Sequence, residues 1–310
     1  MVTTVSKVSK SARLSPRTLA IVVGVGLAFV VLSLVLTALQ PHHVVGIDPT
    51  FGLPSLPRGV PFQRTNHLIA TVAMGVFGLV GVAYGLCDLV RARTVLPLMI
   101  AISGVFVVFP EVFVDIMGAA YYPWAPDVVA YKIFGREMPF FIVAGWFGYG
   151  AFTYLIFRII ASNPTTRSLW LTWFGAALSG VIFEEILLAM GVWHYYGNQP
   201  LVLIRLHPWW WTPCNSVGVF LAAAFAWRFR DTLQGWKALA MAFITPMSVA
   251  GIYAFIAMPA WIVVNANYGW LVTQLGGLLT FGLGFVAFYL VLRLVLRRDP
   301  FEFADRNAVE

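Results

Sequence analysis

Charged residues are scarce in this sequence. Only 11% of its 310 residues are Asp, Glu, Lys or Arg, whereas about a quarter of the residues of a soluble domain are charged. So few charges cannot cover a folded surface of this size with solvated groups, and 60% of the residues are hydrophobic. We therefore exclude a soluble globular domain and expect a protein that faces lipid.

Residues suited to metal or redox chemistry are also few. The chain has two cysteines and five histidines, with no CxxC pair and no clustered histidine box. Gly-rich phosphate loops and Ser-His-Asp signatures are missing as well. We expect no cofactor and no metal, although a metal held by His194, His207 and a Glu is left open. The net charge of +7 is better explained by membrane topology than by a nucleic-acid partner.

Long apolar runs dominate the chain. Runs of this length cross a bilayer as α-helices, because only a helix satisfies every backbone polar group within a single segment. The fold class is therefore all-α, a polytopic transmembrane bundle of about eight helices. They are predicted at residues 18–39, 67–89, 95–117, 138–160, 169–191, 211–229, 238–258 and 270–292.

The basic residues predict the orientation of this bundle. Most of the 20 Lys and Arg residues fall on one side if the N-terminus is inside, and basic loops stay in the cytoplasm. We expect a multi-pass protein of the cell membrane with both termini cytoplasmic. Residues 1–16 would be a basic tail, 17–298 a single transmembrane domain with a long outer loop at 40–66, and 299–310 a second tail.

A short pattern occurs twice. The third and the fifth predicted helices both end in Glu-x5-Met-Gly-x3-Tyr, which starts at Glu111 and at Glu184. An aromatic-rich loop follows each copy, and then a proline, Pro139 or Pro213, opens the next helix. We predict a parallel internal repeat in which helices 3 and 4 correspond to helices 5 and 6.

Four acidic residues fall inside predicted helices: Glu111, Asp115, Glu184 and Glu185. Such residues usually face the bundle interior and mark a function, because a carboxylate is costly in hydrocarbon. Glu111 and Asp115 share a helix face, and Gly118 on the same stripe would let another group approach closely. One of two converging carboxylates can donate a proton while an ionised neighbour stabilises a cation. We take all four as candidate catalytic residues.

The competing interpretation is that these acidic residues lie at the membrane interface and have no function there. Asp115 lies near the predicted outer boundary, where it could snorkel or pair with Lys132 or Arg136. For Asp115 this alternative stays open. For Glu111 and Glu184, which lie a turn or more deeper, the functional interpretation is favoured.

Aromatic residues gather in the loops that follow the two Glu motifs. An interfacial belt of Trp and Tyr explains many of them. Ring faces also stabilise carbocations by cation–π attraction, so some could line a substrate pocket. Our candidate substrate-binding residues, with two further polar groups on the same side, are Tyr122, Trp193, Tyr195, Trp211, Asn215 and His67.

The doubled motif resembles one family. Residues of about 100–225 are similar to bacterial carotenoid-modifying membrane enzymes, namely lycopene cyclases of the heterodimeric type and carotenoid hydratases. The first copy carries the resemblance at Glu111, Asp115, Gly118, Tyr121, Tyr122, Gly135, Pro139 and Trp146. The second copy carries it at Glu184, Glu185, Gly191, Trp193, Tyr195 and Pro213. The cyclases place further acids just after the proline, where this chain has Phe140 and Cys214. The resemblance implies cofactor-free, proton-initiated chemistry on a polyene or another isoprenoid.

Three classes of function remain at this stage. The first is a cyclase or hydratase that acts on a lipid-soluble isoprenoid alkene or epoxide and has membrane lipids around it. The second is a proton-coupled transporter of a small or lipid solute, since intramembrane carboxylates also suit transport. The third is a non-catalytic membrane subunit. The oligomeric state is left open.

Overall fold

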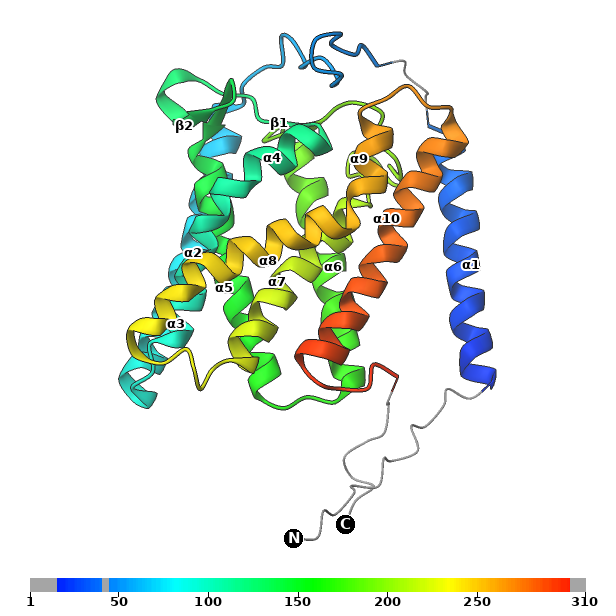
Figure 1. The fold of residues 1–310 in the computed structure, drawn as a ribbon. Helices are drawn as coiled ribbons and strands as arrows, with labels where there is room; N and C mark the ends of the chain where they lie inside the picture. The colour runs from blue at the N-terminus through cyan, green and yellow to red at the C-terminus, as the bar shows by residue number, and fades with distance from the viewer. Residues whose placement is uncertain (1–15, 41–44, 302–310) are drawn as a thin grey trace.

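The computed structural model describes residues 16–40 and 45–301 and shows an all-α helical bundle (Figure 1). In the described part of the chain, seven helical segments are long and apolar enough to cross a membrane. The fold class predicted from the apolar runs is thus confirmed. An eighth helix, α7 (Trp211–Arg228), has 18 residues and more polar residues near its start. It lies inside the bundle and contacts α5, α6, α8 and α10.

The helices follow the predicted runs closely. Their bounds are α1 Pro16–Ala38, α2 Arg64–Ala92, α3 Leu96–Ser103, α4 Val108–Gly118, α5 Phe140–Ala161, α6 Thr166–Ala189, α7 Trp211–Arg228, α8 Met241–Ile256, α9 Met258–Val264 and α10 Trp270–Leu290. Each is rich in Leu, Val, Ile, Phe and Ala, so a helix buries its backbone groups and leaves an apolar surface for lipid.

Two of the predicted spans are not continuous α-helices. The third consists of α3 and α4 joined by a 3-10 turn at Gly104–Val107, and these three pieces together run from Leu96 to Gly118. The seventh begins with a 3-10 turn at Gly235–Ala240, continues as α8 and is followed by the separate short helix α9.

One end of the bundle carries almost all of the non-helical structure, and we call it the loop end (Figure 1). Strand β1 (Ala120–Tyr121) pairs antiparallel with β4 (His194–Tyr195), and β2 (Val129–Ile133) pairs with β3 (Arg136–Pro139). Residues 45–63 pass over this end, and their Val45 exchanges two hydrogen bonds with Asn267 between α9 and α10. At the opposite end α1 begins and α10 ends, as an even number of crossings requires.

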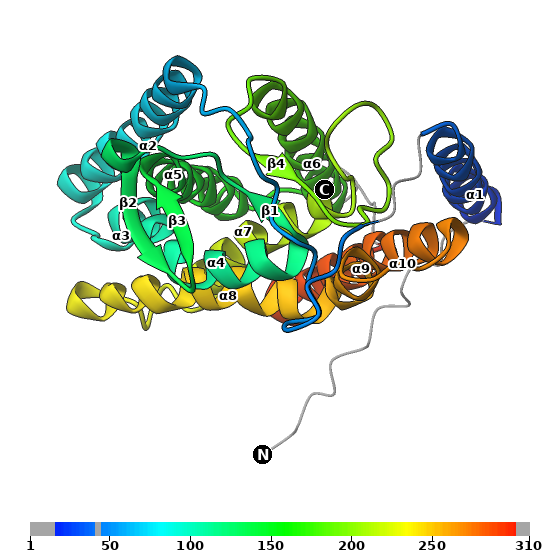
Figure 2. The ribbon, with the colours of Figure 1, turned by 90° about the horizontal axis from the view of Figure 1, so that it is seen from above.

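Seen from the loop end, α2, α5 and α6 form one side of the bundle and α8, α9 and α10 the other, with α4 and α7 between them (Figure 2). Helix α1 stands at the edge beside α10, where the Phe29 and Phe281 rings stack with centroids 4.8 Å apart. The buried core lies around α7 and the facing sides of α4, α5 and α8. The two central helices thus connect the two sides.

Candidate functional site

Three of the four intramembrane acids converge. Glu111 and Asp115 on α4 and Glu184 on α6 line one small cavity of about 80 Å³ near the loop end. All three are buried, with 8%, 3% and 6% of their surface exposed. The walls are mostly aromatic and come from α5, α6, α7, α8 and the two loops, namely Tyr122, Phe141, Trp146, Tyr149, Phe183, Trp193, Tyr195, Trp211 and Tyr253.

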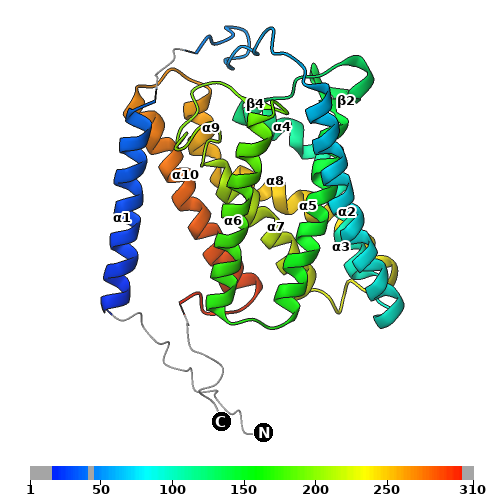
Figure 3. The same ribbon diagram turned by 180° about the vertical axis from the view of Figure 1, so that it is seen from behind.

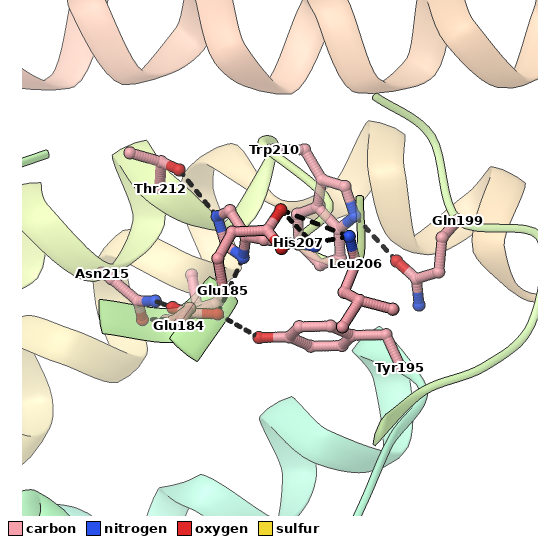
Figure 4. A network of polar contacts seen from close by, with 10 residues as sticks. Glu184, Glu185, Tyr195, Gln199, Leu206, His207, Trp210, Thr212 and Asn215 are labelled. Atoms are coloured by element: carbon pink, nitrogen blue, oxygen red, sulfur yellow. Dashed lines mark hydrogen bonds and ion pairs between the residues drawn. The ribbon is translucent and has the colours of Figure 1, made fainter. Parts of the chain in front are cut away.

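Glu184 is held by three side chains (Figure 4). The Tyr195 hydroxyl donates to its Oε2 at 2.6 Å, and the Nδ2 of Asn215 donates to its Oε1 at 2.7 Å. The Nδ1 of His207 lies 2.8 Å from Oε2. Tyr253 extends the network, because its hydroxyl donates to the Oδ1 of Asn215. Both carboxyl oxygens of Glu184 thus face polar side chains, which fix its position in the cavity wall.

His207 reaches this position because its loop is fixed at both ends. The ring is fully buried, and its Nε2 lies 2.9 Å from the Thr212 Oγ1 in the first turn of α7. Glu185, the neighbour of Glu184 on α6, accepts the backbone N–H groups of Leu206 and His207 at 3.1 to 3.2 Å. Glu185 therefore points at the loop, and it positions His207 and does not face the cavity (Figure 4).

Glu111 and Asp115 have far fewer partners. The Tyr122 hydroxyl lies 3.4 Å from the Oε1 of Glu111 and from the Oδ1 of Asp115, which is long for an O–H···O hydrogen bond. The Oδ2 of Asp115 is buried and has no hydrogen-bond partner within 16–40 and 45–301. No Lys, Arg or His forms an ion pair with either carboxyl group in the described residues. A buried acid without a cationic partner is suited to carry a proton.

The two Glu motifs make the same contact. In each, the hydroxyl of a tyrosine eleven residues after the glutamate donates to the carboxyl group of that glutamate: Tyr122 to Glu111, and Tyr195 to Glu184. The short strands that follow the two helices pair with each other, with Ala120 opposite Tyr195. This contact brings the ends of α4 and α6 together. The internal repeat itself stays a prediction, because α6 is continuous whereas the corresponding span is broken at Gly104–Val107.

Gly118 allows the aromatic wall to close on α4. A Cβ atom at this position would lie 2.3 Å from the Trp211 Cζ2, so only glycine lets the indole pack against the helix end. The close approach expected at Gly118 is therefore confirmed. Trp211 in turn contacts the Tyr195 ring at a centroid distance of 5.1 Å. Packing between the two motifs thus shapes the cavity.

The phenols of both motifs are donors at any physiological pH. Burial raises the pKa of Tyr195 well above its usual value, and the adjacent Glu184 charge raises it further. Burial likewise raises the pKa of Tyr122, with the Asp115 charge as the next cause. Both hydroxyls therefore remain protonated and direct a hydrogen toward a carboxylate.

An apolar groove adjoins the carboxylate cavity. It has a volume of about 470 Å³ and lies between α2 and α5 on one side and α6 on the other, with α7 at its base (Figure 3). Glu184, Tyr149 and Asn215 line both spaces. The groove is flanked by exposed residues of the lipid-facing surface, including Phe77, which is 41% exposed. An apolar molecule in the membrane could therefore extend from lipid to the carboxylates.

The structure brings together most of the residues predicted from the sequence. Those that line the cavity are Glu111, Asp115, Glu184, Tyr122, Trp193, Tyr195, Trp211 and Asn215. Glu185 and His67 do not line it. His67 is buried near the start of α2 against Phe62, at a ring-centroid distance of 4.7 Å, and neither ring nitrogen has a hydrogen-bond partner.

Several residues of the site were not among the candidates from the sequence. Tyr149 and Tyr253 come from the middle of apolar helices, where an aromatic residue gives no sign of which side it faces. Trp146 was named only through the family resemblance, and His207 only as a possible metal ligand, because a loop histidine carries no signal of burial. Thr212 was missed. Tyr122 and Tyr195, by contrast, were marked in the sequence by their equal spacing from the two glutamates.

The described residues contain no group of three or more His, Cys, Asp or Glu side chains that could hold a metal ion. His194 and His207 are not joined by a shared carboxylate, since only His207 contacts Glu184. Comparisons with known proteins return no match: no family model, no curated protein and no solved structure is similar to this chain. The site is therefore interpreted from its own geometry.

Proposed function

We propose that this chain is a membrane-embedded enzyme that performs proton-initiated chemistry on a lipid-soluble isoprenoid alkene or epoxide. The observation that carries the proposal is the union of three buried carboxyl groups with an apolar groove of about 470 Å³ that opens at the lipid-facing surface. In this proposal the loop end faces outward and both chain ends are cytoplasmic, as the distribution of basic residues predicts.

The two sets of carboxyl groups have different roles in the proposed reaction. Glu111, which lacks a cationic partner, would donate its proton to a substrate carbon or epoxide oxygen. With an alkene, the Glu111 O–H bond and the C=C π bond break and a C–H bond forms. With an epoxide, the Glu111 O–H bond and one ring C–O bond break and a hydroxyl O–H bond forms. In both cases a carbocation remains on the substrate. Glu184, held by Tyr195, Asn215 and His207, would supply the negative charge that stabilises this cation.

The second half of the reaction decides the product. If Glu184 takes a proton from the carbon next to the cation, the product is a cyclised or isomerised alkene. If a water molecule adds to the cation and gives a proton to Glu184, the product is an alcohol. The aromatic walls, including Trp193 and Trp211, shield the cation and contribute cation–π stabilisation of about 2 kcal/mol when desolvated.

Asp115 fits beside Glu111 as the second acid of the pair. Its Oδ2 has no partner, and the Tyr122 hydroxyl lies between the two carboxyl groups at 3.4 Å from each. Two neighbouring carboxyl groups in a dry site favour a state in which they share a proton, because both cannot ionise at low cost. This arrangement keeps one proton available beside the cavity.

The proposal is tested by identifying the lipid and then removing the acids. Mass spectrometry of purified protein should find an isoprenoid that copurifies. Membranes containing the protein should convert at least one of four substrates: the copurified lipid, squalene, squalene epoxide or an acyclic carotene. The variants Glu111→Gln and Glu184→Gln should each lower turnover by at least about a hundredfold, the usual contribution of a catalytic acid or base.

Glu137→Gln is the matched control, because Glu137 pairs with Lys132 in the β2–β3 hairpin and does not line the cavity. It should leave turnover unchanged. Full activity of both cavity variants would overturn the proposed roles. Proton-coupled flux of an unaltered solute through proteoliposomes would instead indicate a transporter.

A further inference from the structure

A second cavity adjoins the site from the loop end. Its volume is about 290 Å³, and it lies between the ends of α1 and α10 and the chain at 197–206. Its lining is largely polar and includes Thr37, Tyr195, Val202 and Gln274. None of the roles described above uses this cavity.

The cavity has an exposed rim and a buried polar floor. Gln40, Arg205 and Leu206 are exposed, whereas Gln274 and Thr37 are both only 4% exposed. Gln274 accepts the Leu201 backbone N–H through its Oε1 at 2.8 Å. A space of this size with several polar groups is filled by water, since an apolar ligand would leave those groups without partners.

Tyr195 forms the wall between this polar cavity and the carboxylate cavity, because it lines both. Its hydroxyl is directed at Glu184 at 2.6 Å (Figure 4), and Leu206 also lines the polar cavity. The side chain that holds Glu184 therefore also borders the polar cavity.

The proposed chemistry needs a connection between Glu184 and solvent. A proton that leaves Glu111 and ends on Glu184 must return by way of solvent, and a hydration would also consume water. The apolar groove that admits the substrate offers no polar path, because its surface is mainly aliphatic and aromatic. A polar route for water and protons, separate from the apolar route for the substrate, would satisfy both requirements.

We infer that the polar cavity holds water continuous with the loop-end solvent and supplies water and protons to Glu184 past Tyr195, while the apolar substrate uses the lateral groove. The water-filled cavity stands on its geometry alone. Its role in supply rests on the proposed function.

Cysteine accessibility tests the water-filled cavity without any need for turnover. Thr37→Cys and Val202→Cys place a thiol on two different walls of the cavity, in a Cys87→Ser background that removes the exposed native cysteine. Ser55→Cys, in the exposed loop over the bundle, is the solvent control. Val272→Cys is the lipid control, since Val272 is 49% exposed on the outer face of α10.

A membrane-impermeant trimethylammonium-ethyl methanethiosulfonate reagent attacks only thiols that water can ionise. The two cavity variants should react within about tenfold of the Ser55→Cys rate, and Val272→Cys at least about a hundredfold more slowly. If either cavity variant reacts as slowly as Val272→Cys, the inference is wrong.

A separate experiment tests whether the polar cavity supplies water and protons to Glu184. Val202→Phe, which narrows the cavity, should lower turnover at least about tenfold without reducing the amount of copurified isoprenoid. If Val202→Phe leaves turnover unchanged although both cavity thiols react, the cavity does not supply water and protons to Glu184. If the wild-type protein converts no isoprenoid while both cavity thiols react, the proposed function fails and the water-filled cavity remains.

Discussion

Replacing His207 by leucine should strongly destabilise the protein, because this fully buried ring connects two parts of the site. Its Nδ1 lies 2.8 Å from the Glu184 Oε2, and its Nε2 lies 2.9 Å from the Thr212 Oγ1. Loss of a neutral hydrogen bond costs about 0.5–1.5 kcal/mol, and leaving a buried polar group short of a polar neighbour costs about 1–3 kcal/mol. His207→Leu removes the bond to Thr212 and the polar contact with the buried Glu184, so the expected loss in the free energy of unfolding is about 1.5–4.5 kcal/mol.

Thr212→Val provides an internal scale for this loss. It removes only the neutral bond to the His207 ring and nearly keeps the side-chain volume, so it should cost about 0.5–1.5 kcal/mol. His194→Leu is the control histidine. His194 is half-buried in β4, where desolvation lowers the pKa of its ring, and its replacement should cost less than about 1 kcal/mol.

Equilibrium unfolding in mixed micelles, with sodium dodecyl sulfate as the denaturant and circular dichroism as the readout, measures all three variants. A double-mutant cycle of His207→Leu with Glu184→Gln should show a coupling energy of about 0.5–3 kcal/mol, as expected for residues in contact. The reasoning is refuted if His207→Leu costs no more than Thr212→Val, or if the two changes in the cycle are additive.

Two further results are expected. Gly104→Ala places a Cβ 2.1 Å from a backbone oxygen of α5 and should cost at least about 1–3 kcal/mol in the same unfolding assay, whereas Gly175→Ala, with no atom within 4 Å, should not destabilise. At Asp127, the Arg64 guanidinium holds the pKa of the carboxyl below its usual range, so this pair stabilises the loop end above about pH 4 and is lost as the pH falls through the lowered pKa. The hydrogen-exchange protection factors of residues 126–133, which correct for the slower intrinsic exchange in acid, should therefore fall as the pH drops through the lowered pKa, and Asp127→Asn should abolish this pH dependence.

The fold was predictable because each spanning helix has to satisfy its backbone within one apolar run. The bounds of α5 and α10 differ from the predicted runs by only a few residues. The break at Gly104–Val107 was not anticipated, although the sequence carries a local signal for it: Ser103-Gly104 opens the 3-10 turn, and Pro110 shortly after it has no N–H for the Phe106 carbonyl. It lies where Gly104 and Gly150 let two backbones approach, which is a tertiary contact.

The site was predictable in part for the same kind of reason. Intramembrane carboxyl groups are costly, so Glu111, Asp115 and Glu184 were expected to face inward, and they do. Glu185 carries an identical signal one residue further on, yet it points at the backbone of a loop. Only the folded position of that loop distinguishes the two neighbours, and the same loop places His207, which the sequence marks only as a possible metal ligand.

The central claim is that a carboxyl group of this cavity gives a proton to an isoprenoid carbon or epoxide oxygen. The most direct measurement is turnover of the copurified isoprenoid in deuterated water, with mass spectrometry and NMR of the product. When an alkene reacts, the account predicts that the product carries deuterium on the carbon that is protonated. In Glu111→Gln, both turnover and this deuterium label should be lost. Conversion of an alkene substrate in deuterated water without carbon-bound deuterium in the product, or unchanged labelling in Glu111→Gln, would contradict it.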